Sequence, residues 1–382
     1  MEHFMNPDVL SAIAAGSVAL LVALLLVHTQ SWHGHLSMDS EFGVQKFHTS
    51  PTPRVGGIAI AAGIGAGYLL ADPGRKALLG PLIVAGIPAF AFGLLEDLTK
   101  RVSVRTRLLA TMACGVLGWG ITGHSITGAD VPGLDWLLGF TIFSVVFTAF
   151  AVGGIANAIN IIDGFNGLAA GTVIIILAAF GAITAALGDH DIARVCLILA
   201  GAVTGFLLVN WPLGKIFLGD GGAYFVGFAL AWLAVLIVDR HPELSAWAPV
   251  LVCGFPILEV LFSIVRRRRR NLSPGDPDRL HLHSLVKRRV TRALLPNATN
   301  LVRNSVTGAI MWLAALVPAA MAVAWATNTA MLILGFVVCG LLYTAVYARL
   351  AQFRWFWTTR TVPSDKAQPP ICADQQEAFK KS

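Results

Sequence analysis

The sequence predicts an all-α polytopic membrane protein, a bundle of about 11 transmembrane helices. Of its 382 residues, 56% are hydrophobic and only 13% are charged, and the mean hydropathy of +0.71 is far above that of soluble domains. Eleven apolar stretches, at roughly 20 residues each, are long enough to cross about 30 Å of hydrocarbon as helices. They cover residues 8–28, 55–71, 77–95, 108–123, 136–156, 168–187, 192–210, 222–238, 245–265, 305–325 and 329–348. The first stretch lacks a basic flank and a small-residue cleavage site, so we expect an uncleaved anchor.

The positions of Lys and Arg predict the orientation of this bundle. Of the 28 basic residues, 24 fall in the loops after odd-numbered stretches or in the carboxyl-terminal tail. Because basic residues are retained on the cytoplasmic side, the amino terminus is expected outside and the carboxyl terminus in the cytoplasm. Residues 1–348 would form the membrane domain and 349–382 an interfacial, polar tail. The net charge of +7 suits anionic lipid headgroups, and it requires no nucleic acid.

A polar run directly after the fifth apolar stretch is the most informative motif. Asn157, Asn160 and Asp163 are spaced three residues apart, so they would share one face of a helix. Polar groups at the end of a membrane span must be satisfied or used. Gly164 and Gly167 then permit a turn against which a ligand can press. The alternative is a polar face that serves packing alone.

Two further motifs lie in the first and second loops of the predicted cytoplasmic side. Lys46 and Arg54 flank a segment rich in Pro and Gly, and they are either phosphate ligands or parts of an ordinary turn. Glu96 and Asp97 are adjacent carboxylates, which repel each other at a membrane edge unless cations hold them. They belong either to a salt-bridge cluster with the following basic residues or to a site that binds metal or activates phosphate.

The remaining motifs are a glycine turn and a histidine pair. Asp220 lies between glycines just after Phe217, and a carboxylate on such a turn suits Mg²⁺ that shares its ligands with substrate phosphates. A plain turn is the alternative. The longest loop contains His281 and His283, which could suggest zinc, but no third His or Cys lies nearby. Glu259 is the one acid well inside a predicted span, either functional or a buried partner for a polar side chain.

In this order, from Gln45 to His283, the motifs resemble those of the polyprenyl-phosphate N-acetylhexosamine-1-phosphate transferases. The resemblance implies a helical bundle with its active site on the cytoplasmic face. It implies transfer of an N-acetylhexosamine 1-phosphate from a UDP-sugar to polyprenyl (undecaprenyl) phosphate, with release of UMP. Such a step would initiate a cell-envelope polysaccharide such as O-antigen, capsule, exopolysaccharide or common antigen. The implied cofactor is Mg²⁺, with Mn²⁺ as the alternative, and a homodimer stays open.

The resemblance also implies roles for single residues. Asp220 matches a metal-binding aspartate and Asn160 an asparagine near the metal. Phe217 matches an aromatic residue that stacks on uracil, and Asp163 a carboxylate of the nucleotide site. Glu96 and Asp97 match an Asp-Asp pair whose second member acts on the lipid phosphate, by taking a proton or by orienting the attacking oxygen. His281 and His283 match a His-x-His-His motif. The further expected substrate ligands are Asn157, Arg54, Lys46 and Arg279.

Two departures from the family pattern affect these roles. Glu96 replaces an aspartate, which adds a methylene and weakens the case for direct metal contact there. Ser284 replaces the last histidine, so the acetamido sugar is left open. The rival class is a transporter or lipid flippase, but transporters place ionisable residues near the midplane, often in repeated halves. Here the motif carboxylates lie at span ends, and no internal repeat is evident.

Overall fold

The computed structural model describes residues 7–39, 52–269, 271 and 280–352. Two of the expected substrate ligands, Lys46 and Arg279, lie outside these residues, as does most of the polar tail. Among the described residues, the chain is built of helices and loops apart from one antiparallel pairing of β1 (Met38–Asp39) with β2 (Thr52–Pro53). The predicted all-α membrane class is confirmed.

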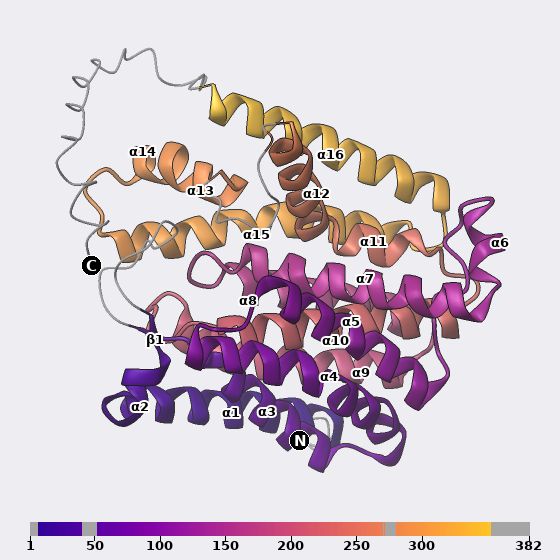
Figure 1. Ribbon diagram of the computed structural model, residues 1–382, viewed down its shortest axis with the longest axis horizontal. Coiled ribbons are helices and arrows are strands. Elements are labelled where there is room, and N and C mark those ends of the chain that lie inside the picture. Colours follow the sequence, from indigo (N-terminus) through magenta and orange to yellow (C-terminus); the bar gives the residue numbers. More distant parts are fainter. Residues whose placement is uncertain (1–6, 40–51, 270, 272–279, 353–382) are drawn as a thin grey trace, which may run out of the picture.

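The long helices run side by side in a bundle (Figure 1). The helices are α1 (Pro7–His28), α2 (Gln30–Ser37), α3 (Gly56–Leu70), α4 (Pro73–Thr99), α5 (Val104–Thr122), α6 (Leu134–Leu138), α7 (Thr141–Ile162), α8 (Leu168–Ala186), α9 (His190–Asn210), α10 (Gly219–Arg240), α11 (Trp247–Val252), α12 (Gly254–Arg268), α13 (Leu282–Val286), α14 (Arg292–Leu294), α15 (Asn300–Ala324) and α16 (Thr329–Ala351), with the π-helical turn η2 (Lys287–Thr291) between α13 and α14.

Eight helices in the described part of the chain are long and apolar enough to cross a membrane: α1, α4, α7, α8, α9, α10, α15 and α16. The other expected spans are helical too, but each differs in one respect. Helix α3 has 15 residues, and α5 has Arg105 and Arg107 in its first turn. The stretch expected at 245–265 is divided into α11 and α12 at Cys253. Pro256 has no N–H for a helical bond to the carbonyl of Val252, which accounts for the break.

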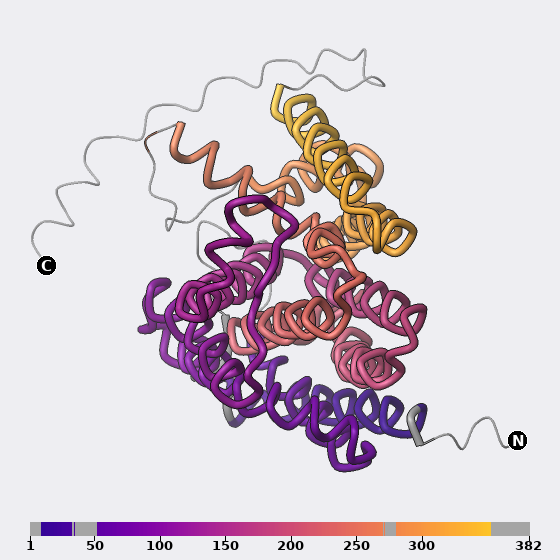
Figure 2. The backbone as a smooth tube through the Cα atoms, turned by 90° about the vertical axis from the view of Figure 1, so that its right-hand side faces the viewer, coloured from indigo at the N-terminus to yellow at the C-terminus, as the bar shows by residue number. Residues whose placement is uncertain are grey.

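Helix α10 forms the centre of the bundle. Figure 2, a view along the helices, shows α1 and α3 on one side of it and α15 and α16 on the other. Glycines let α3 and α4 approach its first turn closely: a Cβ on Gly93 would lie 2.6 Å from the Asp220 carbonyl oxygen, and one on Gly57 would collide with the Gly222 nitrogen. This backbone contact brings the chain before α3, the end of α4 and the start of α10 together at one end of the bundle.

Candidate active site

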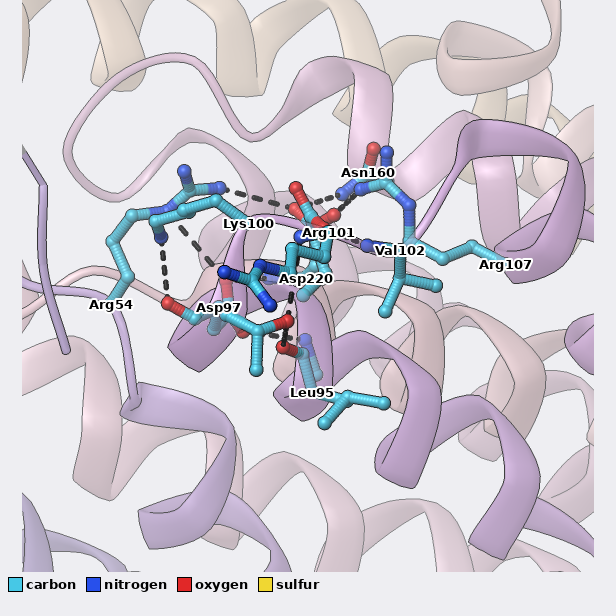
Figure 3. Close-up of polar contacts among 12 residues, drawn as sticks. Arg54, Leu95, Asp97, Lys100, Arg101, Val102, Arg107, Asn160 and Asp220 are labelled. Atoms are coloured by element: carbon cyan, nitrogen blue, oxygen red, sulfur yellow. Dashed lines mark hydrogen bonds and ion pairs between the residues drawn. The ribbon is translucent and has the colours of Figure 1, made fainter. Parts of the chain in front are cut away.

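The carboxylate of Asp220, in the first turn of α10, is the meeting point of side chains from several motifs (Figure 3). Its Oδ1 accepts hydrogen bonds from Asn160 Nδ2 at 3.1 Å and from Arg54 Nη2 at 3.2 Å. Its Oδ2 forms an ion pair with Arg107 Nη1. One carboxylate, 7% exposed, therefore lies between two guanidinium groups and an amide that come from three other parts of the sequence.

Asp97, near the end of α4, binds the start of α10 through both of its oxygens. Oδ1 accepts a hydrogen bond from the backbone N–H of Asp220, and Oδ2 accepts one from Gly221, both at 2.9 Å. Helix N-termini have N–H groups without helical partners and a positive dipole end, so a carboxylate is stabilised there. Arg54 Nε lies 3.7 Å from Oδ1 and adds a cationic neighbour. Asp97, only 1% exposed, thus fixes the helix that carries Asp220.

The turn before α10 is held by backbone pairing with the first loop. The N–H groups of Gly56 and Gly57 donate to the carbonyls of Phe217 and Leu218 at 2.9 and 3.0 Å, and Phe217 N–H donates to Pro53 at 2.8 Å. Gly219 has φ of +74°, and a Cβ there would collide with the Arg54 carbonyl oxygen. Glycine is required here because the backbone is left-handed and the space is filled.

Glu96, the other member of the acidic pair, points into its own loop. Its Oε2 accepts a hydrogen bond from the N–H of Val102 at 2.7 Å. Lys100 adopts φ of +57° and donates from Nζ to the carbonyl of Asp97 at 2.7 Å. The two adjacent carboxylates therefore do different things: Glu96 orders the turn between α4 and α5, and Asp97 binds α10.

Asp163 lies one residue beyond the end of α7, which also carries Asn157 and Asn160. Burial, reinforced by the charge of Asp97, raises the pKa of Asp163 to about 7, although the nearby Arg54 acts in the opposite direction. Asn157 is half-buried one turn before Asn160. The predicted shared face therefore brings Asn160 to Asp220 and leaves Asp163 within electrostatic reach of Arg54 and Asp97.

The loop that follows Asp163 is held by side chains that the sequence reading had not selected. The N–H of Gly167 donates to Asn210 Oδ1 at 2.6 Å, and the Gly167 carbonyl accepts from Trp312 Nε1 at 2.9 Å. Asn166 Nδ2 donates to Ser305 Oγ at 3.3 Å. Asn210 ends an apolar stretch, as Asn160 does, and that was the signal available for it. Nothing local in the sequence marked Ser305 or Trp312.

The histidine pair packs against this loop from the other side. The rings of His281 and His283 stack with centroids 5.3 Å apart, and His283 meets Phe165 edge to face at 5.4 Å. A Cβ on Gly164 would lie 2.9 Å from His283 Nε2. Lys287 Nζ lies 5.3 Å from the Phe165 ring centroid. The start of α13 and the Asp163 loop thus form one unit next to α7.

The structure therefore brings together four of the selected residues directly: Arg54, Asp97, Asn160 and Asp220. It adds Arg107, a residue of the second loop that the sequence does not predict as part of the site. Nothing in the spacing of Arg101, Arg105 and Arg107 told which of them faces Asp220, because helix α5 begins between them. Only the packing of α5 beside α4 turns Arg107 toward the carboxylate.

The residues around Asp220 fit a hard divalent cation by their donor chemistry. Asp220 supplies a carboxylate and Asn160 an amide, the oxygen ligands that Mg²⁺ takes when substrate phosphates complete its shell. No group of three or more His, Cys, Asp or Glu side chains able to hold a metal is found among the residues described. We therefore expect a metal ion here to take part of its coordination shell from substrate oxygens and not from protein ligands alone.

Comparison with known proteins gives concordant matches across this region. The model of glycosyl transferase family 4 matches residues 79–238, which run from α4 through α10. A probable undecaprenyl-phosphate N-acetylglucosaminyl 1-phosphate transferase of Bacillus subtilis is 30% identical over 245 residues, 63% of this chain and 66% of the relative. The undecaprenyl-phosphate alpha-N-acetylglucosaminyl 1-phosphate transferase of Escherichia coli K12 is 27% identical over 71% of this chain and 75% of the relative. That of Salmonella typhi is 30% identical over 64% and 67%.

Proposed function

Because the chain belongs to glycosyl transferase family 4, we propose that it transfers an N-acetylhexosamine 1-phosphate from a UDP-sugar to undecaprenyl phosphate. An oxygen of the lipid phosphate forms a bond to the sugar-bearing phosphorus, the diphosphate bond of the UDP-sugar breaks, and UMP leaves. The observation that carries the proposal is the convergence of Arg54, Arg107 and Asn160 on Asp220 at one end of the bundle. The family resemblance seen in the sequence is confirmed.

The charge of the reactants explains why such a cluster suits this reaction. A lipid phosphate that attacks a diphosphate brings several negative charges together, so the barrier consists largely of repulsion and alignment. Arg54 and Arg107 place two guanidinium groups at one carboxylate, where they are fixed before substrate arrives. Guanidinium groups bind phosphate oxygens in a bidentate manner, which orients as well as neutralises.

A divalent cation belongs to the same proposal. Asp220 and Asn160 would hold Mg²⁺ or Mn²⁺, which would supply further neutralisation of the diphosphate when it is bound. Phe217, in the turn before α10, is proposed to stack on the uracil, and Asp163 to serve the nucleotide site. His281, His283, Asn157, Lys46 and Arg279 stay proposed substrate ligands.

Asp97 is proposed as a positioning residue because both of its oxygens bind the start of α10. A phosphate monoester has a second pKa of about 6, so the lipid phosphate is mostly dianionic at neutral pH and needs little help to lose a proton. Both oxygens of Asp97 are already engaged by the backbone N–H groups of Asp220 and Gly221. The proposed contribution of Asp97 is therefore to hold the start of α10 so that the Asp220 carboxylate lies between Arg54 and Asn160.

The proposed location is the bacterial plasma membrane, with the active site facing the cytoplasm. The loops that carry most Lys and Arg residues are those that lead to Arg54, Arg107 and His281, so the basic side and the site coincide. The product would initiate a cell-envelope polysaccharide. The rival transporter proposal is less well supported, because the site carboxylates Asp97 and Asp220 lie in the last and first turns of their helices rather than midway along them.

A direct assay tests this function. Purified protein is incubated with undecaprenyl phosphate, Mg²⁺ and a panel of radiolabelled UDP-acetamido sugars, and lipid-linked product and UMP are measured. Wild type should give both with at least one donor, and Asp220→Asn should give neither. The matched control is Asp189→Asn, a buried aspartate at the opposite end of the bundle, which should retain activity. A folded wild-type protein that forms no product with any donor would contradict the proposal.

A further inference from the structure

Glu259, in the second turn of α12, is a carboxylate with no solvent exposure at all. Its Oε1 lies 2.9 Å from His281 Nδ1 and accepts a second hydrogen bond from the N–H of Leu282 at 3.1 Å. Its other oxygen, Oε2, is buried and has no hydrogen-bond partner among the described residues. Burial of an ionised carboxylate is costly unless charged or hydrogen-bonding partners compensate it, so this arrangement calls for an explanation.

The contact with Glu259 determines how the His281 ring is presented. Because Oε1 can only accept, Nδ1 of His281 carries the proton in this hydrogen bond. A histidine whose Nδ1–H is bound by a carboxylate has its orientation and tautomer fixed, and Nε2 is the nitrogen presented to a further partner. The neighbouring ring of His283 stacks on His281 at an interplanar angle of 11° and limits rotation from the other side.

The oriented ring belongs to the unit that borders the active site. His283 contacts Phe165 and lies against Gly164, in the loop that starts at Asp163. Arg266, two turns further along α12, donates to the carbonyl of Leu280 at 2.6 Å and ties the helix to the residue just before His281. Helix α12 therefore holds the start of α13 at two points, of which only Glu259 touches an imidazole.

We propose that Glu259 is a positioning residue for the transfer reaction: it fixes His281 so that Nε2 faces a phosphate of the bound substrates. The inference rests on the proposed function, in which His281 is a substrate ligand. Glu259 itself is too deeply buried to meet substrate, so its influence passes through the imidazole. The alternative is a purely architectural part, in which the carboxylate anchors the Leu282 backbone and the ring orientation is incidental.

Two substitutions at one position separate the hydrogen bond from the volume of the side chain. Glu259→Gln keeps an acceptor oxygen for His281 and Leu282, and kcat should stay within about threefold of wild type. Glu259→Met has similar length but no acceptor, and kcat should fall about 10- to 100-fold, as for loss of one charge-assisted hydrogen bond. KM for the UDP-sugar and the thermal melting temperature are measured beside kcat to show that binding and folding persist.

A double-variant cycle decides between positioning and architecture. If Glu259 acts through the imidazole, Glu259→Met should cost little further activity in a His281→Ala background. If the full loss recurs in that background, Glu259 holds the backbone and the proposal is overturned, as it also is if Glu259→Met is as active as wild type. The control is His241→Ala, which removes an imidazole 3.2 Å from the buried Asp189 at the other end of the bundle and should leave kcat within about twofold.

Failure of this inference can be told apart from failure of the proposed function. Wild-type protein that makes no lipid-linked sugar phosphate contradicts the function itself. If wild type is active but the losses from Glu259→Met and His281→Ala are independent, only the positioning of His281 by Glu259 is contradicted.

Discussion

At the scale of single residues, Asp163 and Asp189 form a pair of aspartates with opposite electrostatic surroundings. Burial and the charge of Asp97 raise the pKa of Asp163 to about 7. Burial also acts on Asp189, but hydrogen bonds from the Ile192 N–H, Arg240 and His241 outweigh it and lower the pKa of that carboxyl. Protonation is therefore linked to folding with opposite sign at the two ends of the bundle.

We predict that Asp163→Asn becomes more stable than wild type as the pH rises. A carboxyl whose pKa is raised in the folded state contributes stability below its unfolded value of 3.8, and that stability is lost as the pH rises through about 7. Asparagine cannot ionise, so the difference in melting temperature should be smallest near pH 4, grow as the pH rises to about 7 and level off above about pH 8. Melting of purified protein in detergent, without Mg²⁺ or substrate, measures it.

Asp189→Asn is the control of opposite sign. A lowered pKa contributes stability above the unfolded value, so this variant should melt below wild type throughout the range from about pH 5 to 8. Parallel behaviour of both variants would show that loss of a carboxylate as such, and not its surroundings, sets the pH dependence.

Glycine substitutions at two left-handed positions test the crowding around Asp220. Gly219 and Gly188 have φ of +74° and +82°, but a Cβ meets filled space only at Gly219. Gly188→Ala should lower the melting temperature slightly, at a cost of about 1 kcal/mol from the left-handed conformation. Gly219→Ala should abolish transfer, because the turn must move away from Arg54 and Asp97. Equal activity losses in both variants would mean that backbone strain alone matters.

At the scale of elements, helix α15 holds the loop of the candidate active site through hydrogen bonds of Trp312 and Ser305. Trp312 Nε1 donates to the Gly167 carbonyl, and Trp211 packs against the Trp312 ring with centroids 5.2 Å apart. Trp312→Phe keeps an aromatic ring but leaves the Gly167 carbonyl without this donor. We expect a loss of about 1 to 3 kcal/mol in stability and a lower kcat, since the loop carries Asp163.

Trp247→Phe is the matched control for Trp312→Phe, because it makes the same substitution at a tryptophan whose indole N–H makes no hydrogen bond to the described residues. Trp247 Nε1 is buried and has no hydrogen-bond partner in the described chain, so loss of its N–H removes no bond. Melting temperature and kcat of the two variants should differ, with Trp247→Phe close to wild type. A Trp312→Phe variant that also matches wild type in both measurements would show that packing alone holds the loop.

The helices could be predicted from the sequence more fully than the contacts between them, because hydropathy is a local property. The apolar stretches of the sequence became helices, although residues 136–156 run from α6 into α7 and residues 245–265 are divided between α11 and α12. The second division follows from Pro256, which lies inside a long apolar run that hydropathy alone predicts as one span. Glu259, predicted as either functional or a buried partner, is bound to His281. That contact joins a helix to a loop 22 residues away, so spacing along one helix could not reveal it.

At the scale of the whole molecule, the active-site cluster depends on contacts that carry no sequence signal of their own. Asp97 binds backbone N–H groups 123 and 124 residues away, and any residue type except proline would offer the same N–H. The sequence predicts Asn160 and Asp220 as candidate ligands because amides and carboxylates are unusual at span ends. Only the family resemblance distinguished Asp97 from Glu96, since the packing of α4 on α10, which no local pattern shows, decides which carboxylate points inward.

The orientation of the bundle in the membrane determines which side of the membrane the candidate site faces. Thr99 and Thr127 are exposed residues on either side of α5, the first at the Asp97 end and the second at the opposite end. We expect Thr127→Cys to react with a membrane-impermeant maleimide in intact cells and Thr99→Cys only after the cells are opened. The basic loops at the Asp97 end are the physical reason, because Lys and Arg are retained in the cytoplasm.

The background for this labelling is a chain in which Cys372 is replaced by Ser, because the other native cysteines, Cys114, Cys196, Cys253 and Cys339, are buried or half-buried. The parent without added cysteine sets the level of unspecific reaction. Labelling of Thr99→Cys in intact cells would place Asp220 and its guanidinium partners on the outer face. A UDP-sugar made in the cytoplasm could not reach them there, so that single outcome would contradict the orientation and the proposed donor together.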